Sequence, residues 1–153
     1  MNAMARRRVA HLAQWGLVLL LLVSGFCSAE PQPGRIAAEL NRADTVANGC
    51  RLSFVIRNTT EHDFSSLQWD LVTFDPEGLI AARMAAELAP LRADKTSVKQ
   101  FDIQDFGCDR IARLLLNDIT QCKTKGPDGE MRARNDCLGL MEVSSRTGIE
   151  LFK

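Results

Sequence analysis

The fold class can be inferred first from Cys50-Arg51-Leu52-Ser53-Phe54-Val55-Ile56-Arg57, a segment in which apolar and polar side chains largely alternate. Cys50, Leu52, Phe54 and Ile56 occupy every second position, and polar residues take most of the positions between them. Successive side chains of a β-strand point to opposite faces, so this period of two predicts a strand with one face buried.

The residues after this strand predict a second strand between two turns. Residues 58–63, Asn-Thr-Thr-Glu-His-Asp, have the composition of a turn. Asp75-Pro76-Glu77-Gly78 fits a tight turn with proline second and glycine fourth. Between them, residues 64–74 place Leu67, Trp69 and Leu71 on one strand face, and we expect Trp69 to lie in the core.

Residues 79–88 are compatible with either a helix or a strand. Their alanines and Met84 favour a helix by propensity, whereas the alternate residues from Ile80 to Leu88 would share one face of a strand. Because the segment directly follows a hairpin turn, we expect a strand.

The rest of the chain adds short strands with turn residues at fairly regular spacing. We expect strands over residues 96–103, 111–120, 138–143 and 149–152, and over residues 35–43 a short helix or a loosely lying segment. Six or seven short strands predict an all-β fold, an antiparallel sandwich of the immunoglobulin-like (Ig-like) kind.

Residues 1–29 have the three-part layout of a cleavable signal peptide. A basic start, an apolar centre over residues 15–26 and Cys27-Ser28-Ala29 predict an N-terminal signal helix cut after Ala29. The alternative is a retained membrane anchor, but a spanning helix needs about 20 apolar residues and this centre offers about 12.

We expect export by the general secretion route, with twin-arginine export as the alternative. The product would be a bacterial, periplasmic protein without stable membrane insertion after cleavage. The expected parts are the signal peptide (1–29), an N-terminal extension (30–47) and an Ig-like sandwich domain (48–153).

The charge of the exported chain argues against two kinds of partner. Residues 1–29 contain three arginines and no acidic residue, so their removal changes the formal charge from zero to −3. A mildly acidic chain without a basic cluster gives no electrostatic reason to bind nucleic acid or an anionic membrane.

Removal of Cys27 leaves Cys50, Cys108, Cys122 and Cys137, an even number that in an exported domain predicts two disulfides. Four cysteines allow three connectivities, and the sequence alone does not choose among them. We favour Cys122–Cys137, which would clamp a long polar loop over residues 123–136, and Cys50–Cys108 then follows. A metal site is the alternative, but the chain has no Cys-x-x-Cys spacing and the exported part has one histidine, His62.

Several of these segments resemble a known family. Phe54-Val55-Ile56-Arg57-Asn58-Thr59-Thr60, the strand that ends in Phe74-Asp75-Pro76-Glu77-Gly78, and Leu88-Ala89-Pro90-Leu91 with residues 95–101 look like FxLYD-type Ig-like domains of bacterial envelope proteins. Leu115-Leu116-Asn117-Asp118-Ile119 and the cysteines are also similar to small exported proteins of alphaproteobacteria. The resemblance covers roughly residues 48–143 and implies an Ig-like fold. It implies no catalytic residues, and the cysteine pairs and the long last loop depart from the general pattern.

The residues that could carry chemistry do not form a catalytic pattern. His62 lies in a polar turn without a serine or cysteine nucleophile in a suitable context. Asp102, Asp105 and Asp109 could bind calcium through carboxylate oxygens, but their spacing matches no EF-hand loop and acidic loop decoration is the simpler interpretation. We therefore expect no enzyme activity, no cofactor and no catalytic or metal site.

We expect a non-catalytic module that binds another envelope protein or stabilises a periplasmic assembly. The expected contact surfaces are exposed strand edges and the loop over residues 123–136, which carries Lys123, Lys125, Arg132 and Arg134. Simple solvation is the alternative for these basic residues. A protein that binds a small ligand or a metal ion is the alternative function.

Overall fold

The structure, a computed structural model, describes residues 34–153, so the expected signal peptide (1–29) lies outside the described residues. The described part is built mainly from strands and carries only short helices. The elements in chain order are β1 (Ile36–Val46), β2 (Gly49–Asn58), β3 (Asp63–Phe74), β4 (Ile80–Glu87), β5 (Lys95–Gln104), the 3-10 helix η1 (Cys108–Arg110), β6 (Arg113–Lys125), β7 (Met131–Ala133), α1 (Cys137–Leu140), β8 (Met141–Ser145) and β9 (Glu150–Phe152).

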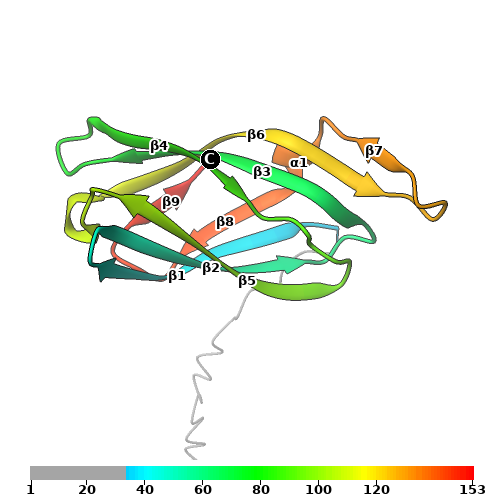
Figure 1. The fold of residues 1–153 in the computed structure, drawn as a ribbon, viewed down its shortest axis with the longest axis horizontal. Helices are drawn as coiled ribbons and strands as arrows, with labels where there is room; N and C mark the ends of the chain where they lie inside the picture. Colours follow the sequence, from blue (N-terminus) through cyan, green and yellow to red (C-terminus); the bar gives the residue numbers. More distant parts are fainter. Residues whose placement is uncertain (1–33) are drawn as a thin grey trace, which may run out of the picture.

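The strands form two sheets that lie one over the other (Figure 1). One sheet has the order β5-β2-β1-β8, and the other has the order β4-β3-β6-β7 with β9 also on β6. This arrangement confirms the expected all-β, two-sheet fold. Two details differ from the expectation: residues 34–153 contain nine strands rather than six or seven, and the pairs β1–β8 and β6–β9 are parallel.

The alternating stretch forms β2 and supplies the centre of the core. Leu52, Phe54 and Ile56 are fully buried, and the Phe54 ring meets Trp69 of the other sheet edge to face at 5.4 Å between ring centroids. Trp69 is itself fully buried, as expected from its position between two leucines. Burial of side chains this large stabilises each by about 1.5–3 kcal/mol relative to exposure, so the contact between the sheets rests on this strand.

The expected helix over residues 35–43 is wrong, because these residues lie in β1, inside the sandwich. Ile36, Ala38 and Leu40 are buried at alternate positions, which is strand rather than helix periodicity. β1 pairs with β2 along its length on one side, and its first five residues pair with β8 on the other. This tertiary pairing outweighs the local helical propensity, and the sandwich begins at Ile36 rather than at residue 48.

Two other segments refine the expected strands. The ambiguous residues 79–88 contain the strand β4, as their place after a hairpin indicated. Only the second half of the expected strand over 138–143 is a strand: α1 occupies Cys137–Leu140, and β8 begins at Met141. The long polar loop is partly ordered as well, since β7 folds back on β6 with Lys125 opposite Met131.

The structure contains both disulfides in the pairing that the loop argument favoured. Cys50–Cys108 ties the start of β2 to η1, where the chain crosses from the first sheet to the second. Cys122–Cys137 ties β6 to α1, where it crosses back. Cys50 lies at the start of β2. Cys122 lies near the end of β6, where Lys125 is opposite Asp63, a residue that follows the end of β2. The two bridges therefore fasten opposite ends of the sandwich. Two disulfides are consistent with an oxidising extracellular or periplasmic environment.

Candidate functional site

The turn between β2 and β3 is held rigidly by one buried side chain. The Asn58 amide nitrogen donates to the carbonyl oxygens of His62 and Arg92, both at 2.9 Å. Its oxygen accepts hydrogen bonds from the Thr60 backbone N–H at 3.0 Å and from the Thr60 hydroxyl at 2.7 Å. Asn58 is fully buried, so each polar atom of its amide must be satisfied internally, and it fixes the path of the turn that carries His62.

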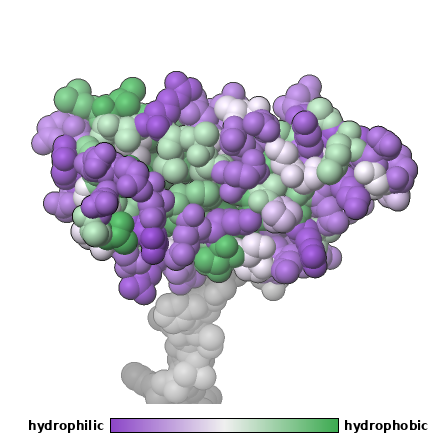
Figure 2. Space-filling model, viewed as in Figure 1, coloured by the Kyte–Doolittle hydropathy of each residue, from purple (hydrophilic) through white to green (hydrophobic). Residues whose placement is uncertain are grey.

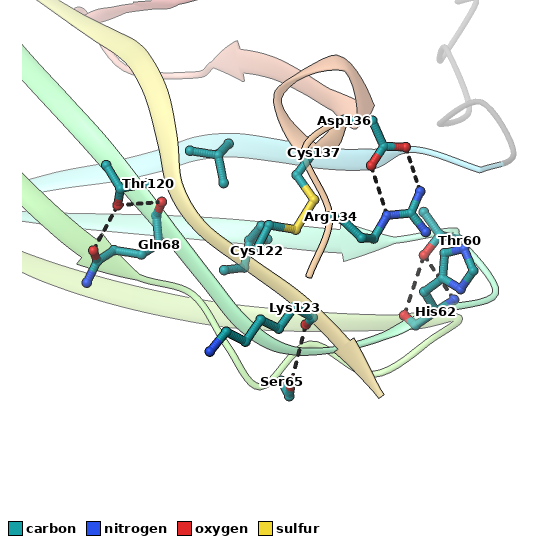
Figure 3. The surroundings of a disulfide bond; sticks show 12 residues. Thr60, His62, Ser65, Gln68, Thr120, Cys122, Lys123, Arg134, Asp136 and Cys137 are labelled. Carbon is teal, nitrogen blue, oxygen red and sulfur yellow. Dashed lines mark hydrogen bonds and ion pairs between the residues drawn. A yellow bond between two sulfur atoms is a disulfide. The ribbon is translucent and has the colours of Figure 1, made fainter. Parts of the chain in front are cut away.

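The segment that leads from β7 to α1 lies beside this turn and is held by the second disulfide. The Arg134 backbone N–H donates to the Cys122 carbonyl at 3.0 Å. The Arg134 guanidinium donates to both carboxylate oxygens of Asp136, at 2.9 and 2.6 Å, and lies between the disulfide and the His62 turn (Figure 3). Hydrogen bonds from Arg134 hold the pKa of the Asp136 carboxyl below its ordinary value, and charge on His62 acts in the same direction. Asp136 therefore stays ionised and keeps Arg134 in place.

The β6–β7 hairpin forms the other wall. The Gly126 N–H donates to the Glu130 carbonyl at 2.9 Å, and the Asp128 carboxylate accepts from the Glu130 N–H at 3.1 Å. Arg132 reaches the same carboxylate at 2.5 Å. The hairpin is thus fixed by its own hydrogen bonds and projects from the end of the molecule (Figure 1).

The turn and the hairpin enclose a groove at this end of the sandwich, which we name the terminal groove. Its volume is about 940 Å³, and a smaller hollow of about 320 Å³ shares Glu61, His62 and Arg134 with it. The residues that line the terminal groove are Glu61, His62, Asp63, Ala93, Thr124, Lys125, Gly126, Pro127, Arg132 and Arg134.

The charges of the terminal groove differ from those that the sequence indicated. Arg132 and Arg134 are neutralised by Asp128 and Asp136 of the same segment. Among the described residues, Lys123 and Lys125 have no ion pair, and only Lys125 lines the groove. With Glu61 and Asp63 on the opposite wall, the terminal groove presents charges of both signs rather than a cationic patch.

The expected candidates elsewhere do not assemble into a chemical site. Asp102 accepts two hydrogen bonds from Arg51, at 2.7 and 2.8 Å, which lower the pKa of its carboxyl. Asp102, Asp105 and Asp109 are not brought together, and residues 34–153 contain no group of three His, Cys, Asp or Glu side chains placed to hold a metal ion. No helix in this part of the chain is long and apolar enough to cross a membrane.

A buried carboxylate on the outer face of the second sheet was not predicted from the sequence. The Asp70 side chain is only 8% exposed, and its two oxygens accept from the Arg83 guanidinium at 2.7 Å each. Asn117 adds a third hydrogen bond at 2.6 Å. These bonds, from Arg83 first and Asn117 second, lower the pKa of Asp70. The sequence does show an acidic residue between Trp69 and Leu71, but it does not indicate that Arg83 and Asn117 bind it.

Comparisons with known proteins give one solved structure and no family. No family model matches the chain, and no curated protein matches it. Among solved structures, the chain is similar to IrmA from Escherichia coli, at 14% sequence identity and a TM-score of 0.49. The match covers 71% of this chain and 90% of that one.

Proposed function

We propose that this chain is an exported, non-catalytic module of the bacterial periplasm that binds another envelope protein through the terminal groove. One observation carries the proposal: the groove is built from a turn and a hairpin that are both fixed in place at one end of a rigid sandwich. Binding residues commonly lie on loops that a rigid scaffold positions.

The disulfide Cys122–Cys137 supports this role, because it holds one wall of the groove. It joins β6 to α1, and the Arg134 backbone between them is hydrogen-bonded to Cys122. A wall that is already ordered costs little conformational entropy on binding, which favours affinity.

The chemistry of the lining favours a protein partner over a small ligand. Apart from Gly126, Ala93 and Pro127 are the apolar residues among those that line the terminal groove, and the others are polar or charged. Small-molecule sites are mostly apolar with a few polar groups, whereas the rim of a protein interface is polar and open to solvent. Lys125 and the acidic side chains of Glu61 and Asp63 suit a partner segment that carries charges of both signs.

Capture from a periplasmic extract tests the proposal. The tip of the hairpin, residues 126–130, is replaced by Asn-Gly, a two-residue turn that suits a β-hairpin and leaves β7 and both disulfides in the chain. Glu77→Lys serves as the control, because Glu77 is exposed and lies in the β3–β4 hairpin at the other end of the sandwich. We expect the wild type and the Glu77→Lys variant to retain the same partner and the shortened variant to lose it. Equal recovery by all three would remove the groove as the binding surface.

A further inference from the structure

The β4 edge of the second sheet supports an inference that is independent of the function proposed above. β4 pairs with β3 on one side, and no strand of the described residues covers its other side. The Leu88 N–H donates to the Leu67 carbonyl at 2.8 Å, and the β3–β4 register is unbroken from there to Ala82. Because bonded and non-bonded pairs alternate in an antiparallel ladder, Arg83, Ala85 and Glu87 direct their backbone groups away from β3.

The charged residues of β4 are symmetric about Ala85. Arg83 lies two residues before it and Glu87 two residues after it, and the three share one side of the strand. If two copies of β4 lie antiparallel with Ala85 opposite Ala85, each Arg83 lies directly opposite Glu87 of the second copy. Opposite charges in directly opposed positions stabilise a strand pair, and this register uses all three outward-directed backbone positions.

Both charged groups have atoms left for such a contact. Arg83 binds Asp70 through Nε and Nη2, so its Nη1 has no partner among the described residues. Glu87 accepts the backbone N–H groups of Leu67 and Ala89 through Oε1, both at 2.9 Å, which leaves its Oε2 without a hydrogen bond from the described residues.

The core-facing side of β4 also fits a second copy. A hollow of about 450 Å³ lies between β4 and β5, and Met84 and Phe101 contribute to its lining. In the register centred on Ala85, each Met84 lies opposite Ala86 of the second copy, so a large side chain meets a small one at this opening. Figure 2 shows pale hydrophobic surface at the middle of this face, along the course of β4, with hydrophilic surface around it.

The β5 edge of the other sheet, whose opposite edge is β8, lacks this self-complementarity. β5 carries Lys95 and Lys99, and charged side chains of this kind protect edge strands from pairing. The Lys99 ammonium group reaches the Ala89 carbonyl at 3.4 Å, between the two edges. Of these two edges, β4 is therefore the one suited to pair with itself.

We propose that two copies of this chain associate through antiparallel pairing of β4 with β4 about a two-fold axis at Ala85, which joins their second sheets into one continuous sheet. Each copy contributes the same residues, as a two-fold interface requires.

Sedimentation equilibrium of the purified, oxidised protein over a wide concentration range tests this inference. We expect the measured mass to rise with concentration to twice that of the single chain. Ala85→Pro removes an outward-directed N–H without breaking a β3–β4 bond and should keep the mass at that of one chain. Val98→Pro, at an exposed, outward-directed position on β5 away from the hollow, is the matched control and should leave the dimer intact.

The outcomes separate the inference from its alternatives. A wild type that stays a single chain at every concentration would overturn it, and so would a folded Ala85→Pro variant that still dimerises or a Val98→Pro variant that dissociates. If circular dichroism shows that Ala85→Pro does not fold, Ala85→Lys decides. That variant places two lysines opposite each other at the axis, and it should be a single chain.

Discussion

Removal of one disulfide at a time should show how much each bridge contributes to the free energy of unfolding. The changes are Cys122→Ala with Cys137→Ala in one variant and Cys50→Ala with Cys108→Ala in the other, since alanine introduces no buried hydroxyl. The bridges close loops with sequence separations of 15 and 58 residues. The chain-entropy relation then gives losses of about 3 kcal/mol for the first variant and about 4 kcal/mol for the second.

Urea unfolding, followed by circular dichroism, measures both losses. With a denaturant slope of about 1.5 kcal/mol per molar urea, the midpoint should fall by about 2 M for the Cys122/Cys137 variant, and further for the Cys50/Cys108 variant. The slope itself should increase in both, because the unfolded chain becomes more extended without a cross-link. A Cys122/Cys137 variant that unfolds at the wild-type midpoint, or that loses more stability than the other, would refute the reasoning from loop length.

Three further predictions concern single side chains. Because the pKa of Asp70 is lowered in the folded state, its contribution to stability is complete above the ordinary carboxyl pKa and is lost as the pH falls through the lowered value; the stability difference between wild type and Asp70→Asn in urea titrations should therefore shrink below about pH 4. Leu40→Ala, at a fully buried position of β1, should destabilise the fold by about 2–5 kcal/mol in the same assay, whereas a loss under about 0.5 kcal/mol would show that β1 is not part of the core. Gly49→Ala should lower the melting temperature, because an added Cβ would lie 1.9 Å from the Ile103 carbonyl oxygen at a φ of 154°, and an unchanged melting temperature would contradict this close approach.

The strands that the sequence predicts correctly are those whose signal is local. β2 alternates over eight residues, and β3 lies between two turns with distinct composition, so pattern alone locates both. β4 has helical propensity, yet its position after Asp75-Pro76-Glu77-Gly78 is sufficient to identify it as a strand. β1 could not be identified in this way, because its residues have helical propensity; pairing with β2 along its length, and with β8 about a hundred residues later, makes it a strand.

The candidate site was only partly predictable for the same reason. The loop over residues 123–136 is recognisable as a long polar segment between two cysteines, and its basic residues are visible in the sequence. The sequence does not show that Arg132 and Arg134 are neutralised within the loop, nor that the His62 turn lies beside it. The contact between the His62 turn and the loop depends on the register of β3 against β6, and this register is shifted at three irregular positions.

Site-specific photo-crosslinking in bacterial cells tests whether the terminal groove binds a periplasmic protein. A photoreactive amino acid replaces Lys125, in the terminal groove, or Glu77, at the other end of the sandwich, in the otherwise intact exported chain. We expect illumination to yield a discrete covalent adduct with one periplasmic protein from position 125 and none from position 77. An absence of adduct at position 125, or the same adduct from both positions, would contradict the assignment of the terminal groove as a protein-binding site.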